Sequence, residues 1–310
     1  MPSRLALLCP GQGAQHPALF ELARGAPQGN TLLEQWMPGA QLDAPLDTVL
    51  SDPTLLFANR VAQPLIVAAT LATWEALRSD MPAPALVAGY SIGELAAYGV
   101  AGSLAPADAV KLAATRARLM DACLRGTPRQ ALAAISGLPL RSAADLVRQH
   151  QFHVAIETGE DSLIAGGAFD QLAALQRAID ASGGRLSVLP VAVASHTPLM
   201  RAAVAPFAAL LEQQHFLDPQ VPVLSGITAE PLQQAGKAIT HLSRQIAETI
   251  VWKDCMDACA EAGITVALEL GPGAALSRML HARQPQIACR SVADFRSLDG
   301  VKKWLVRNVD

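Results

Sequence analysis

Residues 85–98 read Ala-Leu-Val-Ala-Gly-Tyr-Ser-Ile-Gly-Glu-Leu-Ala-Ala-Tyr, which is an apolar run, a glycine-flanked turn and a segment of helical composition. Gly-x-Ser-x-Gly between a strand and a helix is the pattern of a nucleophile elbow, a sharp turn that holds a serine hydroxyl above the end of a sheet. Gly89 and Gly93 lack Cβ atoms, so the strand and the helix can pack closely. The pattern predicts Ser91 as a nucleophile, with an ordinary tight turn as the alternative.

Two glycine turns offer backbone N–H groups to a bound group. The N–H of Ile92 lies at the first turn of the predicted helix, where it would point at an oxyanion formed when Ser91 attacks a carbonyl. The second turn, Pro10–Gln15, follows the predicted strand Arg4–Cys9 and is either such a site or a plain β-turn. It is not a phosphate loop, because the Lys-Ser/Thr ending is absent.

The composition limits the class of protein. A chain of 310 residues with 51% apolar residues has room for one large α/β domain, alone or with an insertion. A net charge of -3 gives no electrostatic reason to expect nucleic acid as a partner. Leu5–Cys9 breaks at Pro10-Gly11, and no apolar stretch reaches the ~20 residues of a membrane helix, so we expect a cytoplasmic protein without a membrane partner.

The five cysteines are scattered along the chain. Cys255 and Cys259 lie four residues apart on one face of a predicted helix, but no cluster of His or Cys completes a metal site. We therefore expect buried thiols that pack as small hydrophobes, and neither a metal nor a cofactor.

Strands and helices alternate along most of the chain, which predicts an α/β fold with a mostly parallel sheet and helices on both faces, like the core of the α/β-hydrolases. Between residues 128 and 196 the predicted order is strand, helix, strand, strand, helix, strand, the order of a ferredoxin-like α+β unit. We therefore expect a large domain made of residues 1–127 and 197–310, with a small subdomain, residues 128–196, inserted into it.

Arg116 is predicted to point inward. It shares one stripe of the predicted helix Ala107–Leu124 with Leu112, Leu119 and Cys123, whereas Arg118 lies on the outward face. A buried guanidinium needs an anion, which is either a carboxylate of the protein or a carboxylate of a substrate.

His196 is the best-placed candidate base among the seven histidines. It is predicted to lie just beyond the strand Leu186–Val193 and before a helix, whereas the others lie in polar or helical surface contexts. A histidine in such a place is also often structural.

Five motifs in this order resemble one family: Pro10–Gln15, Gly89–Glu94, Arg116, Ser195-His196 and Leu270–Gly273. The sequence resembles the malonyl-CoA:acyl-carrier-protein transacylases, the acyltransferases of fatty acid and polyketide synthesis. The resemblance runs nearly from end to end and includes the inserted subdomain.

The resemblance implies a role for each motif. Ser91 would carry the acyl group as an ester, and His196 would accept the serine proton and return it to the leaving thiol. The backbone N–H groups of Gln12 and Ile92 would form the oxyanion hole, and Arg116 would bind the free carboxylate of the acyl group. The implied partners are malonyl-CoA and an acyl carrier protein with a phosphopantetheine-type arm.

Four further positions are implied near the substrate. Gln63 matches a glutamine of the family, and the small Ser195 precedes the base and leaves space beside it. Tyr90 stands where the family commonly has His, and Val251 stands where relatives have a polar side chain. The family orients its histidine through backbone carbonyls in the region of Val251. The elbow tyrosine and the compact length resemble the malonyl-transfer subunit of bacterial malonate decarboxylase.

Two other classes remain open. A serine hydrolase, thioesterase or lipase would use the same serine but needs a carboxylate on its histidine, and Asp161, Asp170 and Asp180 read as subdomain surface. A docking subunit without chemistry would have no reason to keep the serine, the histidine and the inward arginine together.

Overall fold

The computed structural model describes residues 4–309 and is built on two sheets. The large sheet has six strands in the order β10-β9-β1-β2-β7-β8, and all its neighbours pair in parallel except β7 and β8. Its strands are β1 (Leu5–Cys9), β2 (Leu86–Gly89), β7 (Val223–Leu224), β8 (Pro231–Leu232), β9 (Val266–Glu269) and β10 (Ala288–Ser291). The predicted mostly parallel α/β sheet is confirmed.

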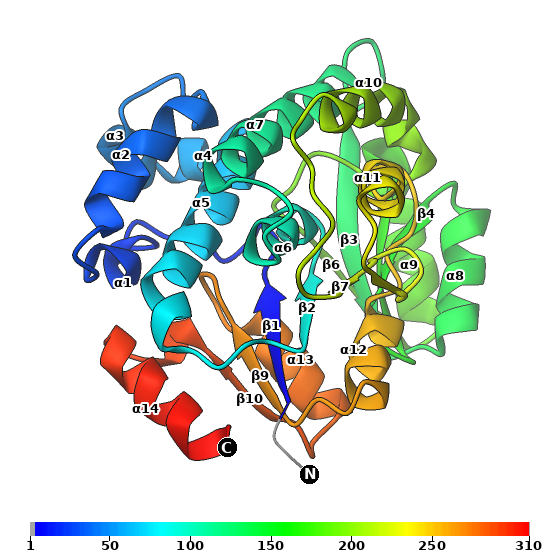
Figure 1. Cartoon of the computed structure of the whole chain (residues 1–310). Helices are drawn as coiled ribbons and strands as arrows, with labels where there is room; N and C mark the ends of the chain where they lie inside the picture. The colour runs from blue at the N-terminus through cyan, green and yellow to red at the C-terminus, as the bar shows by residue number, and fades with distance from the viewer. Residues whose placement is uncertain (1–3, 310) are drawn as a thin grey trace.

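Helices cover both faces of this sheet (Figure 1). In β1, Leu5 and Leu7 pack into one apolar cluster, and the alternate residues Ala6 and Leu8 pack into another. Such alternation is what a strand buried on both sides requires, because successive side chains point to opposite faces. The helices of the large domain are α1 (Glu21–Arg24), α2 (Gly29–Ala40), α3 (Leu46–Ser51), α4 (Pro53–Leu56), α5 (Asn59–Leu77), α6 (Gly93–Val100), α7 (Pro106–Ala122), α10 (Arg201–Glu212), α11 (Ala235–Arg244), α12 (Trp252–Glu261), α13 (Ala275–Arg283) and α14 (Leu298–Asn308).

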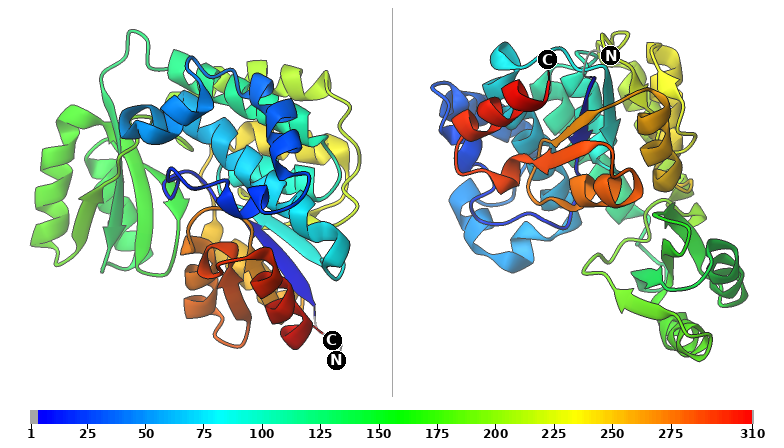
Figure 2. Two further views of the ribbon diagram at one scale, coloured as in Figure 1. Left: turned by 90° about the vertical axis from the view of Figure 1, so that its left-hand side faces the viewer. Right: turned by 90° about the horizontal axis from the view of Figure 1, so that it is seen from below.

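The small unit has the predicted ferredoxin-like arrangement. Its elements are β3 (Gln130–Ser136), α8 (Leu140–Gln149), β4 (His153–Glu157), β5 (Ser162–Ala168), α9 (Leu172–Ala181) and β6 (Arg185–Val188). The strands pair antiparallel in the order β4-β5-β3-β6. Figure 2 shows this green unit projecting to one side of the large sheet. The boundaries at residues 128 and 196 stay a prediction.

Two element ends differ from the prediction. The last strand of the small unit ends at Val188 and not at Val193, so an extended loop leads to His196. Pro190 lies in that loop and has no N–H for a strand ladder.

The second difference lies before α12. The sequence pattern predicts a polar segment and then a helix that ends near residues 251–253, but α11 ends at Arg244. Ile250, in the β-branched run Thr249–Val251, instead pairs with the edge of β4 through its N–H to Ala155 O (3.0 Å) and its carbonyl to Glu157 N (2.8 Å).

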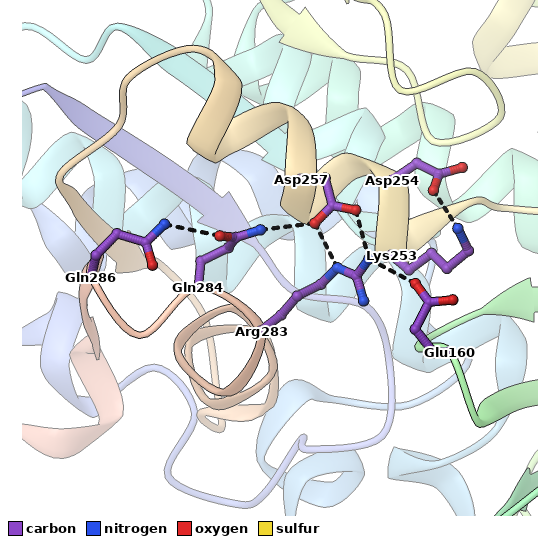
Figure 3. A network of polar contacts seen from close by, with 7 residues as sticks. All are labelled: Glu160, Lys253, Asp254, Asp257, Arg283, Gln284 and Gln286. Carbon is purple, nitrogen blue, oxygen red and sulfur yellow. Dashed lines mark hydrogen bonds and ion pairs between the residues drawn. The ribbon is translucent and has the colours of Figure 1, made fainter.

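A polar network also joins the small unit to the large domain (Figure 3). Arg283, at the end of α13, donates from Nε and Nη2 to both carboxylate oxygens of Asp257 on α12, each at 2.6 Å. Its Nη2 also lies 2.9 Å from Oε1 of Glu160, in the turn between β4 and β5. These contacts and the segment Thr249–Val251 hold the small sheet against α12 and α13.

No helix among residues 4–309 combines the length and apolarity needed to cross a membrane. Within the same residues, no group of three or more His, Cys, Asp or Glu side chains is arranged to hold a metal ion.

Candidate active site

The elbow has the geometry that its sequence predicts. Ser91 lies between the end of β2 and the start of α6 with a φ of 54°, a left-handed conformation that non-glycine residues seldom adopt. A Cβ on Gly89 would lie 2.3 Å from Glu94 Cα, and one on Gly93 would lie 2.1 Å from Cys9 O. Both glycines are therefore required by close backbone packing.

His196 contacts the elbow serine. Its Nε2 lies 2.7 Å from Ser91 Oγ, and its Nδ1 lies 2.6 Å from the backbone carbonyl oxygen of Gln245. A carbonyl only accepts, so the proton of the neutral imidazole is on Nδ1 and Nε2 is free to accept the serine proton. A Ser-His-acid hydrolase places a carboxylate at that Nδ1. Here, the partner is a main-chain carbonyl, as the resemblance implies.

The imidazole of His196 is held neutral. Burial, helped by the positive charge of Arg116, lowers the pKa of His196 to about 3, and the hydrogen bond to Gln245 opposes this only in part. The side chain is 1% exposed. A neutral imidazole in contact with a serine hydroxyl can act as a general base over the whole physiological pH range.

The two backbone donors predicted for the oxyanion hole lie beside the serine. A Cβ on Gly11 would meet Tyr90 O at 2.9 Å, so the Pro10–Gln15 loop packs against the elbow. Among residues 4–309, no hydrogen bond of the chain uses the N–H of Gln12 or of Ile92. Both donors are therefore available to a bound group. Their role as an oxyanion hole stays a prediction.

Arg116 is buried, as its helical spacing predicts, and is 1% exposed. The sequence left open a carboxylate of the protein as its partner, but the partners are two amide oxygens. Nη1 donates to Gln63 Oε1 at 2.7 Å, Nη2 donates to Gln245 Oε1 at 3.2 Å, and Nε is buried without a partner. Burial lowers the pKa of Arg116 to about 10, and nearby Glu94 opposes that shift. The guanidinium therefore stays charged at neutral pH.

Gln63 is held by a chain of polar contacts that reaches the surface of α7. Its Nε2 donates to Asn59 Oδ1 at 2.7 Å, and Asn59 Nδ2 donates to Asp121 Oδ1 at 2.8 Å. The carboxylate at the end of the chain only accepts, so each amide presents its oxygen toward Arg116.

Gln245 is a site residue that no pattern in the sequence predicts, and Val251 as a substrate-binding position stays a prediction. Gln245 is fully buried, and its Nε2 donates to Ser91 O at 3.1 Å and to Glu94 Oε2 at 2.5 Å. Together with its contacts to His196 and Arg116, it joins both ends of the site. Val251 directly precedes α12 and lines an outer groove that also reaches His196. Gln245 follows directly on α11 and has no local motif that distinguishes it from a surface glutamine.

Glu94 was read only as part of the elbow motif, yet it is fully buried. Its Oε2 accepts from Gln245 Nε2 and, at 3.0 Å, from Gly226 N, while Oε1 is buried without a partner. Burial raises the pKa of Glu94 to about 7, although both hydrogen bonds and Arg116 act in the opposite direction.

Tyr90 and Ser195 line a cavity of about 70 Å³ that also contains Ser91 and His196. The ring of Tyr90 packs edge-on against Trp252 at a centroid distance of 5.2 Å. The opposite wall is apolar and comes from the small unit and the loop after it: Leu132, Ala155, Ile156, Ile164, Leu189 and Val191. Ser91 therefore lies between the two parts of the chain.

Known protein sequences resemble this chain over most of its length. Residues 7–298 match the family model of the acyl transferase domain. The chain belongs to the acyl transferase family. This acyl transferase is 33% identical over 300 residues to the malonyl CoA-acyl carrier protein transacylase of Mycobacterium bovis, covering 95% of this chain and 98% of the relative. It is 28% identical over 314 residues to the enzyme of the same name from Haemophilus influenzae, covering 98% and 99%.

Solved structures of such enzymes have the same fold as this acyl transferase. The malonyl-CoA:acyl carrier protein transacylase of Xanthomonas oryzae superposes with a TM-score of 0.91 at 26% identity, covering 99% of each chain. A malonyl-transacylase solved with a type II polyketide synthase acyl-carrier protein has a TM-score of 0.91 at 25% identity, covering 97% of this chain and 99% of its own.

Proposed function

We propose that this acyl transferase moves a malonyl group from malonyl-CoA, through an ester on Ser91, to the thiol of an acyl carrier protein. The observation that carries the proposal is the placement of a neutral Ser91–His196 pair and a buried, charged Arg116 around one residue, Gln245. The pair can carry out acyl transfer, and the buried positive charge of the arginine favours an acyl group with a free carboxylate.

The chemistry needs two thioester–ester exchanges. Ser91 Oγ attacks the thioester carbonyl carbon while His196 Nε2 takes the hydroxyl proton, and the backbone N–H groups of Gln12 and Ile92 donate to the oxyanion. The C–S bond then breaks, and His196 returns its proton to the departing thiolate of CoA. The carrier thiol repeats these steps in reverse order and receives the acyl group, which regenerates the free serine.

Arg116 would bind the free carboxylate of the acyl group. Its Nε and the remaining N–H bonds of its guanidinium are not committed to Gln63 or Gln245. A planar guanidinium with free donors suits bidentate binding of a carboxylate.

The test is a mass measurement of the intact protein. Incubation with malonyl-CoA should add one malonyl group to the wild type and none to Ser91→Ala. Labelling that survives this substitution would place the nucleophile elsewhere and overturn the proposal.

A hydrolase that uses the same serine can be distinguished from an acyltransferase by its products. With malonyl-CoA and a thiol acceptor, we expect acyl transfer to the thiol to exceed hydrolysis. Hydrolysis that the thiol does not outcompete would favour the thioesterase.

Two carrier proteins are candidates for the acyl acceptor. One is an acyl carrier protein of fatty acid or polyketide synthesis, and the other is the carrier subunit of malonate decarboxylase. Tyr90 at the elbow favours the second. Transfer rates to the two purified carriers would decide between them, and a preference for the fatty acid carrier would remove the narrower assignment.

A further inference from the structure

Glu94 and Arg116 contact opposite ends of one buried carboxamide. Arg116 Nη2 donates to Gln245 Oε1 at 3.2 Å, and Gln245 Nε2 donates to Glu94 Oε2 at 2.5 Å. A guanidinium only donates and a carboxylate only accepts, so the amide has one orientation between them. The empty site therefore holds one buried cation and one buried anion, separated by a single amide group.

The other titratable groups around Glu94 are neutral near pH 7. Burial raises the pKa of Tyr98 on α6 and of Cys255 on α12 well above their ordinary values. The negative charge of Glu94 raises both pKa values further. His196 contacts the backbone carbonyl of Gln245 through Nδ1, and it is neutral because its pKa is lowered to about 3. Among the described residues that face Glu94, Arg116 is thus the one charged partner.

A substrate carboxylate changes this balance. Once a malonyl carboxylate binds Arg116, a second anion lies on the guanidinium that Glu94 faces across the Gln245 amide. A second negative charge in such surroundings raises the pKa of a nearby carboxyl that can take a proton. Glu94 is the group with a free position, because its Oε1 is buried and accepts no hydrogen bond that protonation would break.

We propose that Glu94 takes up a proton from solvent, on Oε1, when a malonyl carboxylate binds Arg116, so that binding of the carboxylated donor is linked to pH. The inference rests on the proposed function, because it assumes that the substrate carboxylate lies at Arg116. Acetyl-CoA has the same phosphates and thioester but no such carboxylate, so it leaves Glu94 unchanged.

The size of the effect follows from the distance between the charges. A unit charge about 10 Å away at an effective dielectric constant of about 20 raises a carboxyl pKa by about one unit. Burial already raises the pKa of Glu94 to about 7 in the empty site. Malonyl-CoA should then bring about half a proton per site at pH 7.5, and its Kd should rise roughly tenfold between pH 6 and 9.

The experiment is titration calorimetry on the full-length Ser91→Ala protein, which cannot be acylated. Malonyl-CoA and acetyl-CoA are each titrated at pH 7.5 in buffers of different ionisation enthalpy, and the proton count for acetyl-CoA is subtracted. The additional proton uptake should vanish in Ser91→Ala/Glu94→Gln, where shape is kept and the ionisable group is lost. It should persist in Ser91→Ala/Glu269→Gln, which changes another fully buried glutamate outside the Arg116–Gln245 chain.

Each outcome has a meaning. Equal proton counts for the two donors, or uptake that survives Glu94→Gln, would overturn the inference and leave the proposed function standing. A Ser91→Ala protein that does not bind malonyl-CoA would overturn both. If Glu94→Gln does not fold, the infrared difference spectrum of Ser91→Ala replaces it: a new band of a protonated carboxylic acid on binding malonyl-CoA, but not acetyl-CoA, supports the inference, and its absence overturns it.

Discussion

The two ends of the site make different demands on an acyl donor. At one end, Ser91 and His196 meet beside a small cavity with an apolar wall, and in the proposed function they act on the thioester carbonyl that every acyl-CoA contains. At the other end, Arg116 lies in a buried chain of amides, and in the proposed function it binds only a donor with a free carboxylate. Reactivity and selectivity would therefore depend on different residues, with Gln245 in contact with both sets. Substitutions at the first end should slow all donors alike, and substitutions at the second should separate them.

The largest effect after loss of the nucleophile is expected for His196→Ala. General acid–base catalysis contributes about 10²–10⁴-fold, and the same imidazole serves both half-reactions. We expect losses of that size for malonyl-CoA and acetyl-CoA alike in single-turnover acylation. An acylation rate equal to that of the wild type would remove His196 from the mechanism.

The pH dependence of acylation sharpens this point. The pKa of His196 is lowered to about 3, so the neutral base is present above that value and is lost only as the pH falls through it. With acetyl-CoA, the acylation rate should therefore be level from about pH 5 to pH 8 and should not rise through the ~6.5 of free histidine. A rise with a midpoint near 6.5 would show that the imidazole is not held neutral by its surroundings.

Arg116→Ala should separate the two donors. Removing one partner of a buried charge pair costs roughly 2–5 kcal/mol, which is about 30-fold to several thousand-fold in kcat/KM for malonyl-CoA. Acetyl-CoA has no carboxylate to lose and should react as well as before or better. Arg118→Ala is the matched control on the same helix, because Arg118 is exposed and bonded to Gln41. Equal losses for both donors would make Arg116 structural.

A smaller and equally selective effect is expected for Gln63→Glu. The new carboxylate would lie on Arg116 Nη1, where Gln63 Oε1 accepts at 2.7 Å, and would compete with the malonyl carboxylate. A hydrogen bond to a charged group contributes about 1.5–3 kcal/mol, so kcat/KM for malonyl-CoA should fall by about ten- to a hundredfold. The value for acetyl-CoA should stay near that of the wild type. An unchanged ratio of the two donors would show that Gln63 does not act through Arg116.

The sequence predicted those parts of the site that have local patterns. The elbow follows from two glycines that backbone packing requires, and the inward direction of Arg116 follows from helical spacing. The ferredoxin-like unit follows from the order of its strands and helices.

The remaining parts depend on contacts between distant segments. Gln245 lies 151 positions from Glu94 and 129 from Arg116, and its own neighbourhood resembles an exposed helix end. Glu94 sits at a helix N-terminus, where an acidic side chain is favourable for local reasons and attracts no notice. The expected strand to Val193 failed because a proline ends the ladder, and the expected helix near Val251 failed because β-branched residues pair with β4.

The smallest effect on acyl transfer is expected for Glu269→Gln, which tests whether burial alone gives a glutamate a role in the site. Glu269 resembles Glu94: it is fully buried, Oε1 has no partner, Oε2 accepts from Ser277 N at 2.9 Å, and burial raises the pKa to about 7. Its charged neighbour is Asp294, which raises the pKa further, and not a cation.

The Glu269 carboxyl ionises near the ordinary glutamate pKa of about 4.3 in the unfolded state and only near 7 in the folded state. The free energy of unfolding therefore falls as the pH rises between these values. Glu269→Gln removes that dependence, so its Tm should fall less than that of the wild type between pH 5 and 8, while the ratio of malonyl to acetyl transfer stays unchanged. Parallel curves of Tm against pH would contradict the first expectation. A changed donor ratio would show that a buried glutamate need not lie beside Arg116 to select the substrate.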